Sequence, residues 1–361
     1  MQPTIQTLRP HAETAYSEEL AALCQQETRR IPAGWKMSPQ SVVMYLMGGT
    51  LPDGTTISPK YFGNRRIIEV AVATLVTDRA LLLTGIPGTA KTWVSEHLAA
   101  AISGASHLLV QGTAGMSEEA LRYGWNYALL LAEGPSERAL VPSPVMKAMS
   151  QGQLVRIEEL TRIPSDVQDA LITVLSEKTL PVPELNTEVQ AVSGFNLIAT
   201  ANDRDKGVNE LSSALRRRFN TVVMPLPETL EEEVAIVTHR VQSTALQLDI
   251  SDKPLPSQEV RRLVTIFREL RSGATEDGRT RLKSPSSTLS TAEAISVIHN
   301  GLALATHFGN GTLLVADMAA SMKGAIIKDD KQDTPVWEEY VETVIRTRKG
   351  WGDLYEACKE G

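Results

Sequence analysis

The residues best suited to chemistry lie in a loop that follows the short apolar run at residues 80–84. The loop reads Gly85-Ile86-Pro87-Gly88-Thr89-Ala90-Lys91-Thr92. This is the phosphate-binding pattern G-x-x-x-x-G-K-[ST], with alanine in place of the last glycine. Glycines allow the backbone to wrap closely around phosphate oxygens, and the N–H groups that open the following helix supply an anion site.

Lys91 and Thr92 carry the side chains of this loop that act directly. Lys91 is expected to reach the β- and γ-phosphates of a nucleotide, and the Thr92 hydroxyl to ligate Mg²⁺. Because alanine has the smallest side chain after glycine, we expect Ala90 to be tolerated with a helical φ. The alternative is a glycine-rich turn with a chance lysine, which leaves the apolar run before it and the helical pattern after it unexplained.

Polar residues also end two further apolar runs. Glu158 and Glu159 follow the run at 154–157, and Asn202 follows the run at 195–200. Acids at the carboxyl end of a parallel strand lie beside the ligand crevice, and an amide there can position a water next to a γ-phosphate. The alternatives are a solvated acidic pair and an ordinary turn asparagine.

The segments that must position these residues alternate between strand and helix patterns. The apolar runs of strand length are 80–84, 108–110, 154–157, 195–200 and 221–224. Helical patterns between them include 93–102 and 165–178, and the second opens with a capping-box pattern, Ser165-x-x-Gln168. Alternating strands and helices predict an α/β fold with a mostly parallel sheet and helices on both of its faces.

The chain divides, on this reading, into four parts. Residues 1–58 form an N-terminal helical extension, with helices over 17–30 and 38–46, and residues 59–226 form the α/β nucleotide-binding domain. Residues 227–252 form a linker helix, and residues 253–361 a smaller helical lid domain with a capping box at Ser290-x-x-Glu293.

Composition places the protein among ordinary globular chains. It has 361 residues, of which 42% are hydrophobic and 22% charged, and a net charge of −7 that argues against a nucleic-acid partner. No run approaches the roughly 18 apolar residues that span a bilayer, and the N-terminus has no secretory signal. Two cysteines and six scattered histidines form neither a disulfide framework nor a metal-ligand pattern, so we expect a cytoplasmic protein.

Five segments in this order resemble the MoxR family of AAA+ ATPases, over about residues 60–305. The segments are 61–64 (YFGN), 85–92 (GIPGTAKT), 158–172 (EELTRIPSDVQDALI), 199–203 (ATAND) and 215–219 (LRRRF). The resemblance implies a P-loop AAA+ sheet domain followed by a smaller all-helical lid. Residues 116–144 and 180–192 lie where this family has hairpins.

The resemblance implies that the ligands are ATP and Mg²⁺. Tyr61, Phe62 and Gly63 correspond to the family's adenine-contacting segment, while the loop from Gly85 to Thr92 holds the phosphates. Glu158 takes the place of the family's second Mg²⁺ ligand, beside Thr92.

The resemblance also implies catalytic and assembly roles. Glu159 activates or orients water, Asn202 positions it, and Arg218 acts as an arginine finger on a neighbouring chain. Such a finger requires self-association, in relatives a ring of six, and relatives act with proteins that carry von Willebrand A domains. The alternative for the basic triplet Arg216, Arg217 and Arg218 is a solvated helix end, and which of the three acts is open.

The function that follows is an ATP-hydrolysing ring ATPase of MoxR type that remodels or matures a protein partner. Two departures from the family weaken hydrolysis. Glu158 stands where aspartate is usual, and Ser286, after Lys283-Ser284-Pro285, stands where relatives have a lid arginine. We therefore expect slow turnover, and the alternative is a nucleotide-gated scaffold that binds ATP with little or no hydrolysis. A nucleic-acid motor finds no support in the charge.

Overall fold

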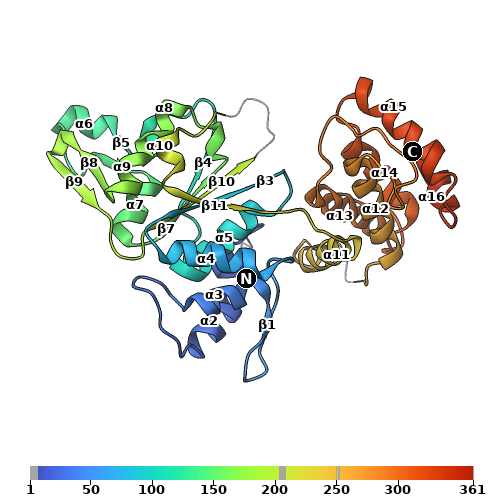
Figure 1. Cartoon of the computed structure of the whole chain (residues 1–361), viewed down its shortest axis with the longest axis horizontal. Helices are drawn as coiled ribbons and strands as arrows, with labels where there is room; N and C mark the ends of the chain where they lie inside the picture. The colour runs from blue at the N-terminus through green and yellow to red at the C-terminus, as the bar shows by residue number, and fades with distance from the viewer. Residues whose placement is uncertain (1–6, 203–208, 249, 251–252, 361) are drawn as a thin grey trace, which may run out of the picture. The chain divides into compact units, whose positions relative to one another are not determined.

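Five of the short apolar runs form one parallel sheet, in the order β11-β3-β10-β7-β4 (Figure 1). The strands are β3 Ala80–Gly85, β4 Leu109–Gln111, β7 Leu154–Glu158, β10 Asn196–Asn202 and β11 Phe219–Val223. All four neighbouring pairs run parallel. The computed structural model describes residues 7–202, 209–248, 250 and 253–360. The predicted fold, a parallel α/β sheet followed by a helical region, is confirmed.

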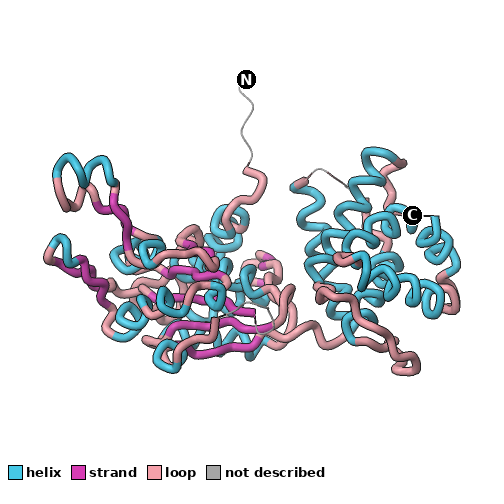
Figure 2. The backbone as a smooth tube through the Cα atoms, turned by 90° about the horizontal axis from the view of Figure 1, so that it is seen from above, coloured by secondary structure: helices cyan, strands magenta, loops and turns pink. Residues whose placement is uncertain are grey.

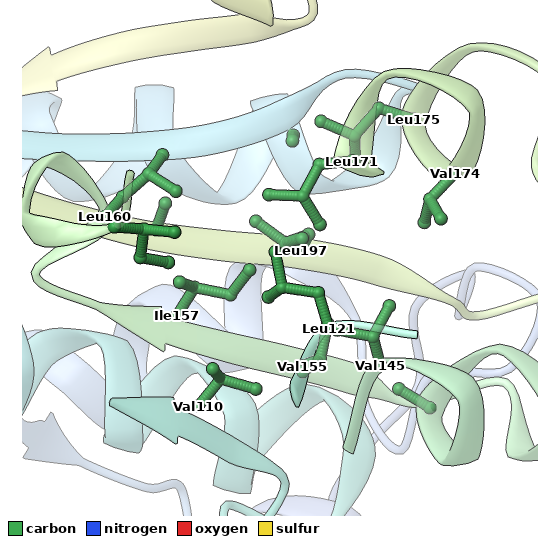
Figure 3. Close-up of a cluster of buried hydrophobic side chains, with 14 of the residues drawn as sticks. Val110, Leu121, Val145, Val155, Ile157, Leu160, Leu171, Val174, Leu175 and Leu197 are labelled. Carbon is green, nitrogen blue, oxygen red and sulfur yellow. The ribbon is translucent and has the colours of Figure 1, made fainter. Parts of the chain in front are cut away.

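The alternation of side chains along the strands divides the core of the sheet into two layers. Leu82, Val155 and Leu197 point to one face, where they pack with α7 Pro144–Gln151 and α9 Ala170–Ser176 (Figure 3). Leu81 and Ile198, their neighbours in sequence, point to the other face and pack with α4 Arg65–Val76 and α5 Lys91–Ser103. Helices therefore cover both faces, as parallel sheets require.

Residues 9–58 pack into the same unit as the sheet and differ in this from the separate extension that we expected. Their helices are α1 Ala12–Ala15, α2 Ser17–Gln25 and α3 Pro39–Met47. Leu23 of α2 and Tyr45 of α3 are buried in one cluster with Ile68 of α4 and Leu98 of α5. The expected loop after α3 contains a short antiparallel pair, β1 Gly49–Thr50 with β2 Thr56–Ile57.

Two antiparallel hairpins project from the sheet unit, and Figure 2 shows both as magenta pairs on its left side. In the first, β5 Tyr123–Trp125 pairs with β6 Leu140–Pro142, and α6 Tyr127–Glu133 lies between them. In the second, β8 Thr179–Val182 pairs with β9 Thr187–Gln190. The first hairpin lies within the predicted segment 116–144, and the second begins one residue before the predicted segment 180–192.

The helix predicted over 165–178 is broken at Asp169 into α8 Ser165–Gln168 and α9. Ser165 does not form the expected capping box, because α8 begins after Pro164 and has no side-chain cap. Gln168 instead donates a hydrogen bond of 2.8 Å from its side-chain amide to the carbonyl oxygen of Ile163, which anchors the turn before the helix.

The chain from Leu226 onward forms a second unit, which is helical. Its helices are α11 Leu230–Gln247, α12 Ser257–Ser272, α13 Thr291–Phe308, α14 Val315–Ile326, α15 Asp330–Tyr340 and α16 Gly352–Glu360. The predicted capping box of Ser290 and Glu293 is present at the start of α13. Val237 and Val241 of α11 are fully buried in the core of this unit, so the expected linker helix is one of its packing elements. In the described part of the chain, no helix combines the length and the apolar character that crossing a membrane demands.

Candidate functional site

The sheet brings the predicted site residues together at the carboxyl ends of three adjacent strands. The phosphate loop follows β3, Glu158 ends β7 and Asn202 ends β10, which lies between them. Asn202 is in register with Gly85, the first residue of the loop. Asp203, the last residue of the segment 199–203, lies outside the described residues. This edge is where ligands bind in open parallel α/β sheets.

The side chain of Lys91 folds back over the loop that precedes it. Lys91 is buried, and its Nζ donates hydrogen bonds of 2.8 and 2.9 Å to the carbonyl oxygens of Gly85 and Ile86. Gly88 has a φ of +83°, a left-handed conformation that favours glycine. The N–H groups of the first turn of α5 complete a set of donors suited to an anion.

The expectation that Ala90 has a helical φ was wrong. Its φ and ψ are 63° and 20°, so it adopts the left-handed rather than the helical conformation. This is the position at which the common pattern has glycine, and glycine takes that conformation freely. For alanine the left-handed region costs roughly 1–2 kcal/mol, because Cβ approaches the following carbonyl oxygen.

We expect Ala90→Gly to raise the free energy of unfolding by up to about 1.5 kcal/mol. Relief of the strain at Ala90 stabilises the folded protein by roughly 1–2 kcal/mol. The greater conformational freedom of glycine in the unfolded chain offsets roughly 0.5–1 kcal/mol of this gain. Urea denaturation measures the difference. Ala99→Gly is the matched control, because Ala99 is buried inside the same helix, and it should destabilise the protein. A loss of stability in Ala90→Gly as large as that of the control would contradict the strain.

Glu158 is held by a saturated set of hydrogen bonds. Its carboxylate is almost completely buried, with the residue 2% exposed. One oxygen, Oε2, accepts from the hydroxyls of Thr92 at 2.8 Å and Thr200 at 2.6 Å. The other, Oε1, accepts from the hydroxyl of Ser95 at 2.6 Å and from Nη2 of Arg156 at 2.9 Å. Both carboxylate oxygens are therefore held by donors of the same chain, and the expectation that glutamate at this position slows turnover stays a prediction.

The pair of Thr92 and Glu158 fits a Mg²⁺ ion. The hydroxyl and the carboxylate oxygen that the sequence assigned to the metal lie within hydrogen-bond distance of each other. Both are hard oxygen donors, which Mg²⁺ prefers, and Mg²⁺ in nucleotide sites uses only one or two protein ligands in addition to phosphates and waters.

Glu159 and Asn202, the predicted water-positioning residues, are in direct contact. Nδ2 of Asn202 lies 3.0 Å from each carboxylate oxygen of Glu159. Glu159 has a left-handed φ of 56°, and its N–H donates to the hydroxyl of Thr200 at 3.1 Å. Arg162 adds an ion pair, with Nε 3.6 Å from Oε2 of Glu159. A strained backbone at a charged residue is typical of functional sites, because the surrounding contacts must enforce it.

Several residues that shape the site were not singled out from the sequence. They are Ser95, Gly112, Arg156 and Thr200. A Cβ at Gly112 would lie 2.3 Å from the carbonyl oxygen of Glu159, so only glycine allows the chain after β4 to approach there. Two of them left a signal in the sequence. Gly112 comes soon after the apolar run at 108–110, and Arg156 is a charged residue inside the apolar run at 154–157.

The predicted adenine-contacting segment lies beside the start of α5. The N–H of Tyr61 donates to the carbonyl oxygen of Leu46 at 2.9 Å, and Tyr61 is buried. The indole Nε1 of Trp93, two residues after Lys91, donates to the carbonyl oxygen of Lys60 at 2.9 Å. Phe62 and Gly63 follow directly, before α4. The structure therefore places this segment next to the helix that carries the phosphate loop.

The basic triplet lies at the opposite end of the strands. The N–H of Ala80, the first residue of β3, donates to the carbonyl oxygen of Arg218, whereas the phosphate loop follows the last residue of β3. At about 3.3 Å per residue, the length of β3 separates the two ends by roughly 20 Å. Arg218 donates to the hydroxyl of Ser176 at 2.7 Å and to the carbonyl oxygen of Ala214 at 2.6 Å. Arg216 and Arg217 are exposed.

In the helical unit, the position expected for a lid arginine has a structural role. Ser286 donates hydrogen bonds of 2.7 Å from its N–H and 2.9 Å from its hydroxyl to the carboxylate of Asp333. Burial opposes ionisation of Asp333, but the hydrogen bonds from Ser286 and from backbone N–H groups outweigh it and lower its pKa to about 2. Lys283, the suggested substitute, forms an ion pair with Glu339 at 3.1 Å.

The chain is similar in sequence to known proteins, to one of them along nearly its whole length. Residues 80–219 match the family described as AAA domain (dynein-related subfamily), and residues 231–358 match the YehL-like AAA+ ATPase C-terminal domain. The Escherichia coli (strain K12) protein YehL is 39% identical over 355 residues, which are 97% of this chain and 96% of that protein. A Staphylococcus aureus (strain USA300) protein is 30% identical over 154 residues, 42% of this chain and 58% of that protein.

Among solved structures, NtrX from Brucella abortus in complex with ATP is 14% identical, with a TM-score of 0.49, covering 84% of this chain and 69% of that chain. The family assignment rests instead on the sequence match to YehL and on the two family matches. The chain therefore belongs to the AAA+ ATPase family and is a YehL-like member of it.

Proposed function

We propose that this protein binds ATP with Mg²⁺ and hydrolyses it in a ring of identical chains, in order to remodel or mature a protein partner, as in the MoxR type of AAA+ ATPase. The observation that carries the proposal is the contact of Glu159 with Asn202 at the ends of adjacent strands. Glu158 and Thr92 lie beside this pair, and the phosphate loop follows the next strand.

Each residue then has a defined task in the hydrolysis. Lys91 leaves the loop carbonyls to bind the β- and γ-phosphates, while the N–H groups of the loop hold their oxygens. Glu159 orients the attacking water and accepts its proton, and Asn202 fixes the position of the Glu159 carboxylate. Thr92 and Glu158 would hold the Mg²⁺ ion, and its charge would offset negative charge on the phosphates.

The position of the basic triplet supports a ring. Arg216, Arg217 and Arg218 lie roughly 20 Å from the phosphate loop of their own chain, which an arginine side chain does not span. A role in phosphate chemistry therefore requires a second chain whose loop meets this end of the sheet. The number of chains, six by resemblance, and a partner with a von Willebrand A domain are part of the proposal.

One observation favours a second candidate function, a nucleotide-gated scaffold. Both oxygens of Glu159 accept from Asn202, and Arg162 forms an ion pair with the same carboxylate. If these contacts persist when ATP is bound, Glu159 does not engage water, and the chain binds nucleotide without turning it over.

We expect Glu159→Gln to retain ATP binding and to lower the steady-state ATPase rate at least about 100-fold, because glutamine cannot accept the proton of the attacking water. Phosphate release by the assembled protein measures the rate, and calorimetry measures the binding. Glu119→Gln, an exposed acid outside the site, is the control and should change neither. ATP binding by the unaltered protein without measurable turnover would support the scaffold instead.

A further inference from the structure

A buried arginine lies in the middle of the strand that ends at Glu158. Arg156 is paired with Ile198 of β10 on one side and with Leu109 of β4 on the other, so it lies inside the sheet. Its side chain is 4% exposed and that of Glu158 is 3% exposed, and the two form an ion pair of 2.9 Å. Side chains two residues apart on a strand share a face, which brings the guanidinium and the carboxylate to the same side of β7.

The guanidinium is fixed by three further groups, which belong to α5 and the loop after it. Nε donates to the hydroxyl of Ser95 at 3.1 Å, and Nη1 to the carbonyl oxygen of Ser106 at 3.2 Å. Nη2 donates to the carbonyl oxygen of Thr92 at 3.2 Å as well as to Glu158. The hydroxyl of Ser95 donates in turn to Oε1 of Glu158. Arg156 is therefore held in one place by contacts that do not involve a metal.

The carboxylate of Glu158 has two sides with different partners. Oε1 faces Arg156 and Ser95, whereas Oε2 faces Thr92, its expected co-ligand for Mg²⁺. With Mg²⁺ bound, one carboxylate would serve two cations. Because the site is buried, the charge of Arg156 is weakly screened, so it repels a divalent ion and also withdraws negative charge from the ligand that the ion needs.

We propose that Arg156 is a positioning residue that shares the Glu158 carboxylate with the metal and thereby raises the Mg²⁺ concentration at which nucleotide binds tightly. The inference rests on the proposed nucleotide site. It also accounts for the residue type at position 158, because the longer side chain of glutamate reaches the hydroxyls of Thr92 and Thr200 with one oxygen while the other stays on Arg156.

Calorimetry of ADP binding across a series of Mg²⁺ concentrations tests the inference, because ADP is not hydrolysed during the titration. Arg156→Met removes the charge and keeps the length of the side chain. We expect it to lower, at least about tenfold, the Mg²⁺ concentration at which half of the Mg²⁺-dependent gain in ADP affinity is reached. This is conservative for the loss of a full charge in a medium with an effective dielectric constant of about 20. Arg156→Lys keeps the charge and should stay near the unaltered protein.

Arg156→Gln provides a second neutral variant, because its amide can still donate to Ser95 or Glu158 if the methionine variant does not fold. Thermal unfolding establishes that each variant is folded. The inference would be overturned if this Mg²⁺ concentration were unchanged in the folded neutral variants, or if it shifted equally in Arg156→Lys. Arg156 would then have only a structural role, in its ion pair with Glu158. A wild-type chain that binds no ADP at any Mg²⁺ concentration would overturn the proposed nucleotide site itself, and this inference with it.

Discussion

Lys91→Ala is expected to weaken ATP binding strongly. In the proposed site, Lys91 supplies the positive charge that binds the β- and γ-phosphates. In the structure its Nζ lies over the loop, within 2.8 and 2.9 Å of two carbonyl oxygens. Removing one partner of a buried, hydrogen-bonded charge pair costs roughly 2–5 kcal/mol, so the affinity should fall about 30-fold or more. Isothermal titration calorimetry measures the change.

Lys147→Ala is the matched control for this experiment. Lys147 is an exposed lysine of α7, and no role in the site is assigned to it, so its removal should leave ATP affinity unchanged. Thermal unfolding of both variants separates loss of the charge from loss of the fold. If the folded Lys91→Ala protein binds ATP as well as the control does, the loop is a glycine-rich turn and not a phosphate site.

The second large effect concerns Arg218, the arginine that we propose acts between chains. We expect Arg218→Ala to bind ATP normally but to hydrolyse it about 10³–10⁵-fold more slowly, which is the contribution of arginine fingers in related phosphoryl-transfer sites. Activity per chain of the unaltered protein should rise with protein concentration as rings form. Phosphate release, measured at concentrations above and below assembly, shows both effects.

Mixing two inactive variants tests whether the arginine acts on a neighbour. Lys91→Ala chains keep the arginine and Arg218→Ala chains keep the loop, so a mixed ring pairs some intact arginines with intact loops and recovers part of the activity. Native mass spectrometry establishes that the two chains assemble together. Co-assembled rings without recovery would show that Arg218 does not act across the interface.

Arg216 and Arg217 need to be compared with Arg218 in the same mixing experiment. Arg218 is engaged with Ser176 and Ala214 of its own chain, whereas Arg216 and Arg217 are exposed. Both line a cavity of about 450 Å³ together with Glu210, Leu211 and Ser213. Arg216→Ala and Arg217→Ala, each mixed with Lys91→Ala in the same way, identify the arginine that acts if Arg218 does not.

Local pattern was sufficient for the five strands of the parallel sheet and for the edge at which the site forms. The apolar runs predicted these strands, and the rule that ligands bind at the carboxyl ends of parallel strands predicted that Glu158, Glu159 and Asn202 lie at this edge. The capping box at Ser290 and Glu293 was also correct, because both of its hydrogen bonds are made within one turn. Each of these inferences depends on residues that are close in sequence.

Where the expectation failed, contacts between distant segments decided the outcome. Ala90 is left-handed because the loop must turn between β3 and α5, whose directions are set by packing on the sheet. The amphipathic pattern of α11 is compatible both with a linker helix and with a helix of the core. The burial of Val237 and Val241 shows that it is a helix of the core. Residues 9–58 likewise join the sheet unit through a shared core rather than through any local motif.

The sequence by itself determined the AAA+ fold class, the phosphate loop and the two acids at the carboxyl end of β7. Only the tertiary structure decided that Arg156 and Ser95 share one oxygen of Glu158 while Thr92 and Thr200 share the other. These residues come from three separate segments, α5, β7 and β10. These segments meet only because one particular face of α5 packs on β7 and β10. Hydrophobic burial over the whole unit decides which face that is. The spacing of residues along the chain does not encode it.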